Sequence, residues 1–179
     1  MTDDNEEGVF SGWRDVPLSR RGIRDAKIVA LRLRDKKFTL AFQSDQLRSS
    51  QTLKEVLKFH RHVKVITDNR IKERSYGNLQ GKTHLEIVKK FGYKKYDVWH
   101  RSYDSKPPQG ESFKDVDKRV SSFLKDLLEI MRDEKVSVVI SAHNNSMRVF
   151  RKHFEKLSID ETCRIYNDYE QVYEYEVDV

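Results

Sequence analysis

The stretch Val136-Ser-Val-Val-Ile-Ser-Ala-His-Asn-Asn-Ser-Met-Arg148 decides the fold of this chain. Its short run of β-branched residues predicts a buried parallel strand. The strand ends at His143, and Ser146 is expected to cap the helix that follows. His143 would then lie beside a helix N-terminus at the carboxyl end of a core strand, where α/β sheets bind ligands and backbone N–H groups favour phosphate. The alternative interpretation is a polar turn that contains a histidine by chance.

The composition is typical of one soluble domain spanning residues 1–179. Charged residues make up 36% of the chain and hydrophobic residues 37%, and no apolar run approaches the roughly 18 residues of a membrane span. A basic segment followed by an apolar run is not found at the N-terminus, so secretion is not predicted. The single Cys163 cannot form an internal disulfide, so we expect a cytoplasmic location.

The net charge of +6 predicts affinity for anions. Lysines and arginines are scattered among acidic residues, so the charge alone gives no specific support for nucleic acid binding. Nucleic acid and a small phosphorylated metabolite both remain possible partners on this ground. The motifs considered next favour the metabolite, with neither nucleic acid nor a membrane as partner. Whether the chain forms homo-oligomers is left open.

Apolar periodicity predicts strands that alternate with helices. Strands are expected at 38–42, 63–66, 136–142 and 172–177, and helices after Ser19, after Ser44, from Thr83, from Ser112 and from Ser146. Loops are expected over 1–8, 68–81 and 93–110. This alternation favours a mostly parallel three-layer α/β/α sandwich.

Two strand ends point to the same edge of the predicted sheet. Ser44 and His143 each follow a strand and precede a helix, and Arg48 lies one turn beyond Ser44. An arginine, a histidine and two helix N-termini at one crevice predict an oxyanion or phosphate site.

Six motifs follow one another along the chain: Phe10-Ser-Gly-Trp13, Ser44-Asp-Gln-Leu-Arg-Ser-Ser-Gln-Thr52, Asn69-Arg-Ile-Lys-Glu-Arg-Ser-Tyr-Gly-Asn-Leu-Gln-Gly81, Trp99-His-Arg-Ser-Tyr-Asp104, Gly110-Glu-Ser112 and Ala142-His-Asn-Asn-Ser-Met-Arg148. Together they resemble the histidine phosphatase superfamily, most closely its 2,3-bisphosphoglycerate-dependent phosphoglycerate mutase branch. The resemblance covers nearly the whole chain.

The resemblance implies three catalytic residues. Arg48 would bind phosphate, His143 would be the second catalytic histidine, and Glu73 would donate and accept protons. The residues expected at the substrate are Asn5, Ser11, Gly12, Arg74, Tyr76, His84, His100, Arg101, Asn144 and Asn145. No metal is implied and no cofactor is bound permanently, although 2,3-bisphosphoglycerate is expected as a primer.

One motif of the family is absent from the sequence. Its members carry the nucleophile in an Arg-His-Gly triplet that ends the first, central strand, and neither is found here. The chain is therefore expected to begin directly after its own nucleophile and to be inactive as given. The only Arg-His pair, Arg61-His62, precedes a strand and falls at the opposite edge of the sheet.

Smaller departures concern specificity. His84 replaces a lysine near the substrate carboxylate, His100 replaces the first arginine of a clamp whose second member is Arg101, and Asn144 replaces a glycine. We expect a mutase that interconverts 3- and 2-phosphoglycerate in glycolysis and gluconeogenesis. The alternatives are a phosphomonoesterase of the histidine acid phosphatase type and a non-catalytic phosphate-binding module.

Overall fold

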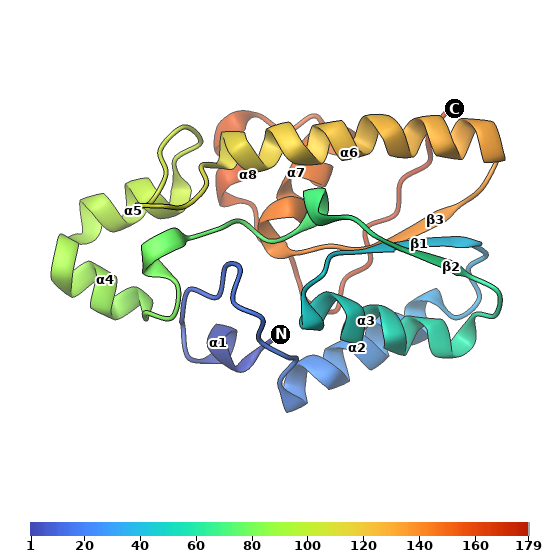
Figure 1. Cartoon of the computed structure of the whole chain (residues 1–179), viewed down its shortest axis with the longest axis horizontal. Coiled ribbons are helices and arrows are strands. Elements are labelled where there is room, and N and C mark those ends of the chain that lie inside the picture. Colours follow the sequence, from blue (N-terminus) through green and yellow to red (C-terminus); the bar gives the residue numbers. More distant parts are fainter. Residues whose placement is uncertain (179) are drawn as a thin grey trace.

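A three-stranded parallel sheet lies at the centre of the protein (Figure 1). The computed structural model describes residues 1–178. Its strands are β1 (Leu40–Gln43), β2 (Lys64–Thr67) and β3 (Val138–Ser141), in the order β2-β1-β3. Leu40 pairs with Lys64 on one side and with Val138 on the other. The expected parallel α/β fold is therefore confirmed.

Helices cover both faces of the sheet. Helices α2 (Arg20–Leu33) and α3 (Leu47–Val56) lie on one face, and α6 (Phe113–Glu134) and α7 (Asn144–Glu155) lie on the other (Figure 1). The larger core joins β1 to the buried stripe of α6, whose side chains recur at helical spacing. Members of this core include Leu40, Phe42, Val116, Val120, Phe123, Leu127 and Phe150.

A second, smaller core packs an arm at one end of the molecule (Figure 1). The arm consists of α4 (His84–Phe91) and α5 (Tyr93–Arg101), separated by Gly92 at φ +80°. A loop was expected over residues 93–110. This prediction is wrong for residues 93–101, which form α5. Tyr96 and Trp99 lie three residues apart, so one face of α5 packs against the core that contains Phe10 and Ile87.

Short elements complete the chain. They are α1 (Asp3–Glu6), the 3-10 turns at Leu57–Phe59, Asn69–Ile71 and Gly77–Leu79, and α8 (Ile159–Arg164). The loop expected over 1–8 is wrong for α1, because Thr2 and Asn5 form a capping box that stabilises one helical turn. No helix within residues 1–178 is both long and apolar enough to cross a bilayer.

The strand expected at 172–177 is not formed by the described residues, which end at 178. Alternating apolar side chains show only that one face of a segment is buried, whereas a strand also needs a backbone partner. The segment packs through side chains: the Tyr175 ring stacks on Phe154, and its hydroxyl donates to Glu155. Within residues 1–178, β3 pairs with β1 only.

Candidate active site

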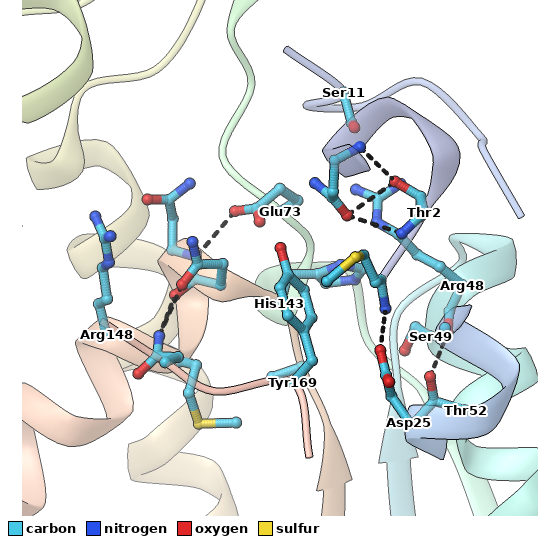
Figure 2. Close-up of a pocket in the computed structure, with 18 of the residues that line it drawn as sticks. Thr2, Ser11, Asp25, Arg48, Ser49, Thr52, Glu73, His143, Arg148 and Tyr169 are labelled. Atoms are coloured by element: carbon cyan, nitrogen blue, oxygen red, sulfur yellow. Dashed lines mark hydrogen bonds and ion pairs between the residues drawn. The ribbon is translucent and has the colours of Figure 1, made fainter. Parts of the chain in front are cut away.

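A cavity of about 470 Å³ opens at the carboxyl edge of the sheet (Figure 2). The ends of β1 and β3 meet there, because parallel strands present their carboxyl ends to one edge. Its walls come from the first twelve residues, from α2 and α3, from the loop of Glu73, from the α4–α5 arm, from the start of α7 and from the segment 166–173. The convergence expected from the sequence is therefore present.

His143 lies at the floor of this cavity and is 7% exposed. Its Nε2 is 2.7 Å from the Ser44 hydroxyl, so the ends of the two strands are joined by one hydrogen bond. Burial first, and then the positive charge of Arg48, hold the pKa of His143 well below its ordinary value. The imidazole is therefore neutral near pH 7.

The helix after β3 begins at Asn144, two residues earlier than the expected cap at Ser146. His143 is the N-cap, in extended backbone at φ −125°. Ser146 acts from inside the first turn, where its hydroxyl accepts from the His143 N–H and donates to the His143 carbonyl. The expected cap at Ser146 is therefore wrong. In a capping box the third residue of the helix, here Ser146, forms hydrogen bonds back to the N-cap residue.

Arg48 extends from the first turn of α3 toward the N-terminal loop. Its Nη1 donates to the Arg14 carbonyl at 2.9 Å and its Nη2 to the Gly12 carbonyl at 2.8 Å. Burial lowers the pKa of Arg48, and the carboxylate of Glu73 opposes that shift. A guanidinium has five N–H donors, so Arg48 keeps donors for an anion after these two contacts.

Glu73 connects the loop after β2 to the helix that follows His143. Its Oε1 accepts from the backbone N–H groups of Arg74, at 2.7 Å, and Asn145, at 3.1 Å. Within residues 1–178 no hydrogen bond engages Oε2, and the side chain lines the cavity (Figure 2). A carboxylate with one oxygen fixed and one exposed to the cavity can move a proton there.

The structure places all but one of the predicted site residues at the cavity. The lining includes Asn5, Ser11, Gly12, Arg48, Glu73, Tyr76, His84, His100, Arg101, His143, Asn144 and Asn145. Their roles toward a substrate remain predictions. Asn144 does not adopt a positive φ, so the strain considered for its replacement of glycine is absent.

Arg74 is the exception, and its expected contact with substrate is corrected. The residue is fully buried and does not line the cavity. Its guanidinium donates instead to backbone carbonyls at Trp99, His100, Ser105 and Glu111. Arg74 therefore fixes the end of α5 against the loop that carries Glu73, because a planar guanidinium can bind several carbonyls at once.

The N-terminal loop closes the cavity over Arg48. The Ser11 hydroxyl is buried without a hydrogen-bond partner in residues 1–178, and it faces the cavity (Figure 2). Gly12 adopts φ +51°, and a Cβ there would lie 2.2 Å from the Gln80 amide oxygen. Glycine is therefore required where the carbonyl turns toward Arg48.

Sequence reasoning missed Arg148 as a cavity residue. Its Nη1 donates to the Cys163 carbonyl at 2.9 Å, its Nε is buried without a partner in the described chain, and Arg101 donates to the same carbonyl at 3.3 Å. Arg148 lies within the motif that begins at Ala142, so its place one turn beyond Asn144 was a usable signal. Other lining residues that were missed include Thr2, Asp25, Ser49, Thr52 and Tyr169.

The cationic character of the cavity defines the class of site. Arg48, Arg101 and Arg148 line it, and within residues 1–178 none of them has a carboxylate within ion-pair distance. Arg148 is buried and the other two arginines are half-buried, and guanidinium groups in such surroundings without carboxylate partners favour an anionic ligand. Fold and site together define an α/β protein with a cavity at the carboxyl edge of a parallel sheet, and the arginines of this cavity favour an anionic ligand.

The sequence profile of the histidine phosphatase superfamily (branch 1) matches residues 1–178. The chain belongs to this superfamily. A phosphoglycerate mutase of Schizosaccharomyces pombe is 37% identical over 166 residues, which cover 89% of this chain and 78% of that protein. A 2,3-bisphosphoglycerate-dependent phosphoglycerate mutase of Mesorhizobium japonicum is 36% identical over 167 residues, which cover 90% of this chain and 80% of the relative.

Solved structures share the fold. Bacillus stearothermophilus YhfR superposes with a TM-score of 0.80 at 27% identity, over 90% of this chain and 78% of that one. A mycobacterial glucosyl-3-phosphoglycerate phosphatase in complex with VO3 superposes with a TM-score of 0.78 at 25% identity, over 91% and 80% of the two chains. The similar proteins thus include both mutases and phosphatases, which supports phosphoryl-transfer chemistry of the histidine phosphatase type.

Proposed function

We propose that this chain belongs to a phosphoglycerate mutase-like phosphotransferase that interconverts 3- and 2-phosphoglycerate, with 2,3-bisphosphoglycerate as primer. The observation that carries the proposal is the convergence of Arg48, Glu73 and His143 in one cavity whose arginines have no carboxylate partner among residues 1–178. The names of the similar mutases support the substrate. A cytoplasmic location fits such a metabolite and the lone Cys163 thiol.

The proposed chemistry splits one displacement into two. An imidazole nitrogen attacks phosphorus, a new N–P bond forms, and the P–O bond to the substrate alcohol breaks while Glu73 gives that oxygen a proton. The acceptor hydroxyl then loses its proton to Glu73 and attacks phosphorus, which forms the new ester and breaks the N–P bond. Arg48 and His143 hold the equatorial oxygens, whose charge spreads in the transition state.

The nucleophile of this scheme is a second imidazole beside His143. The histidines that line the cavity are His84, His100 and His143, none of which belongs to an Arg-His-Gly triplet. We infer that residues 1–178 bind the transferring phosphate without carrying it covalently. This is the reason to keep a phosphate-binding module without turnover as a second candidate function.

Calorimetric titration tests the phosphate site. We expect inorganic phosphate and 3-phosphoglycerate to bind the wild-type chain, and Arg48→Ala to weaken both by at least about tenfold, since a charge-assisted contact contributes about 1.5–3 kcal/mol. Arg132→Ala, an exposed arginine near the end of α6, is the matched control and should bind normally. Equal affinities for the two variants would contradict the site.

Turnover separates the candidate functions. Phosphorus NMR with 3-phosphoglycerate and catalytic 2,3-bisphosphoglycerate should show 2-phosphoglycerate if the mutase assignment holds. Rapid release of inorganic phosphate from an aryl phosphate, without isomerisation, would instead establish the phosphomonoesterase. Binding without either reaction would establish the phosphate-binding module for this chain.

A further inference from the structure

Tyr96 of α5 lies between two histidines of the cavity wall. Its hydroxyl oxygen is 3.1 Å from Nδ1 of His84 and 3.0 Å from Nδ1 of His100. Both imidazoles line the cavity, whereas Tyr96 does not. The tyrosine therefore stands behind the wall and joins the two rings, whose centroids are 5.2 Å apart.

The bridge fixes where the imidazole protons lie. A hydroxyl has a single proton, so Tyr96 can donate to one Nδ1 only and must accept from an Nδ1–H of the other ring. A neutral imidazole carries one proton. One ring therefore presents an Nε2–H donor and the other an unprotonated Nε2 acceptor, and within residues 1–178 no hydrogen bond occupies either atom.

Both rings are held neutral by their surroundings. Burial first, and then the charge of Arg101, lowers the pKa of His100 to about 2 and also lowers that of His84. Arg74 and Arg148 act on His100 in the same direction. Phe10 packs on both imidazoles, with ring centroids 4.1 Å from His84 and 5.5 Å from His100, and this packing limits their rotation.

We propose that His84 and His100, bridged by Tyr96, form a neutral donor–acceptor pair that recognises a hydroxyl group of the phosphorylated substrate. A hydroxyl between the two Nε2 atoms accepts from one and donates to the other, and so satisfies both. The substrate class is a phosphomonoester that carries a free hydroxyl a few bonds from its phosphate. This assignment rests on the proposed function, because the phosphate is held at Arg48 in the same cavity.

Four ligands separate the hydroxyl from other groups. Inorganic phosphate reports the Arg48 half alone, propyl phosphate adds a carbon chain, glycerol 3-phosphate adds hydroxyls, and phosphoglycolate adds a carboxylate without a hydroxyl. By calorimetry we expect the wild-type chain to bind glycerol 3-phosphate about five- to tenfold more tightly than propyl phosphate. Equal affinities for these two ligands would overturn the pair.

Variants of α5 test the bridge. Tyr96→Phe removes the shared hydroxyl, and the preference for glycerol 3-phosphate over propyl phosphate should fall to within about twofold. Tyr93→Phe is the matched control, because Tyr93 is 68% exposed on the same helix and lies outside the cavity lining, and it should keep the preference. His100→Arg restores a cation and should turn the preference toward phosphoglycolate. An unchanged preference in both Tyr96→Phe and His100→Arg would contradict the assignment.

Nitrogen-15 NMR of the histidine rings gives a readout independent of affinity. We expect His84 and His100 to be in opposite tautomers in the wild-type chain, and this fixed pattern to be lost in Tyr96→Phe. The same tautomer for both rings would overturn the proposal even if Tyr96→Phe failed to fold. If inorganic phosphate does not bind at all, the proposed function fails; if it binds without a hydroxyl preference, only this pair fails.

Discussion

His143 couples the stability of the protein to pH. Its folded-state pKa lies well below the value of about 6.5 expected for an unfolded chain, chiefly because the ring is buried. Below that value the unfolded chain takes up a proton that the folded chain does not accept. The contribution is therefore fully present above about pH 6.5 and is lost as the pH falls, which is the sign required by proton linkage.

We expect the free energy of unfolding to decrease between about pH 6.5 and pH 5. The slope from His143 approaches about 1.4 kcal/mol per pH unit, and His143→Gln should remove that part of it. Urea denaturation at a series of pH values measures the slope. His153→Gln, at an exposed histidine of the helix that His143 caps, is the matched control variant. The same slope in His143→Gln as in the wild type would contradict the prediction.

Site residues that lie close to the end of a predicted strand could be predicted from the sequence. Arg48 and His143 each follow a strand within a few positions, so their meeting at one edge follows from parallel topology alone. The partnership of Tyr96 with His84 and His100 could not be predicted, because it depends on how α4 and α5 pack together. Arg74 matched a motif, yet burial among backbone carbonyls gave it a structural role.

At the scale of elements, α6 holds the loop that carries Glu73. Arg119 of α6 donates to the carbonyls of Arg70, Lys72 and Glu73, and its Nε donates to a carboxylate oxygen of Glu111 at 2.9 Å. The ion pair is mostly buried, with side-chain exposures of 17% and 18%. A single guanidinium thus connects one helix to three backbone carbonyls of the loop.

Replacing Arg119 should loosen this loop without touching a ligand. We expect Arg119→Met to lower the free energy of unfolding by about 2–4 kcal/mol, because Glu111 and several carbonyls lose their donor together. It should also weaken 3-phosphoglycerate binding through displacement of Glu73. Urea denaturation and calorimetry measure the two effects. Arg132→Met on the same helix should change stability by less than about 0.5 kcal/mol, and a loss of that small size in Arg119→Met would refute the role.

The sequence predicts the existence of a helix or strand better than it predicts the residues at which the element begins and ends. The expected strand at 38–42 is β1 at Leu40–Gln43, and the helix expected from Ser112 begins at Phe113 with Ser112 as its cap. Helix α5 was missed because its lysines and the nearby Pro107-Pro108 resemble a loop in composition, whereas burial of Trp99 determines the helix. The segment 172–177 needed a backbone partner that alternation cannot supply.

At the scale of the whole molecule, packing is uneven around the sheet. The first half of α6 is densely packed, and Val116 and Val120 are fully buried there. Beside β3 there is a cavity of about 310 Å³, whose lining includes residues of α2, α3, β3, the second half of α6, α7 and the segment 171–177. Every residue of β3 is only partly buried, whereas the first three residues of β1 are buried. A larger side chain on this side of β3 can therefore be accommodated without displacing a neighbouring side chain.

Because packing is looser beside β3 than around Val116, replacing valine by isoleucine should have opposite effects on stability at Val138 and at Val116. Val138→Ile adds a methylene beside the 310 Å³ cavity and should stabilise the protein by up to about 0.8 kcal/mol, because the added group is removed from water without displacing a neighbour. Val116→Ile adds the same methylene where the core has no free space, and should destabilise by about 1–3 kcal/mol. Urea denaturation of both variants measures the difference. Destabilisation of the same size at both sites would mean that β3 is packed as tightly as the core around Val116.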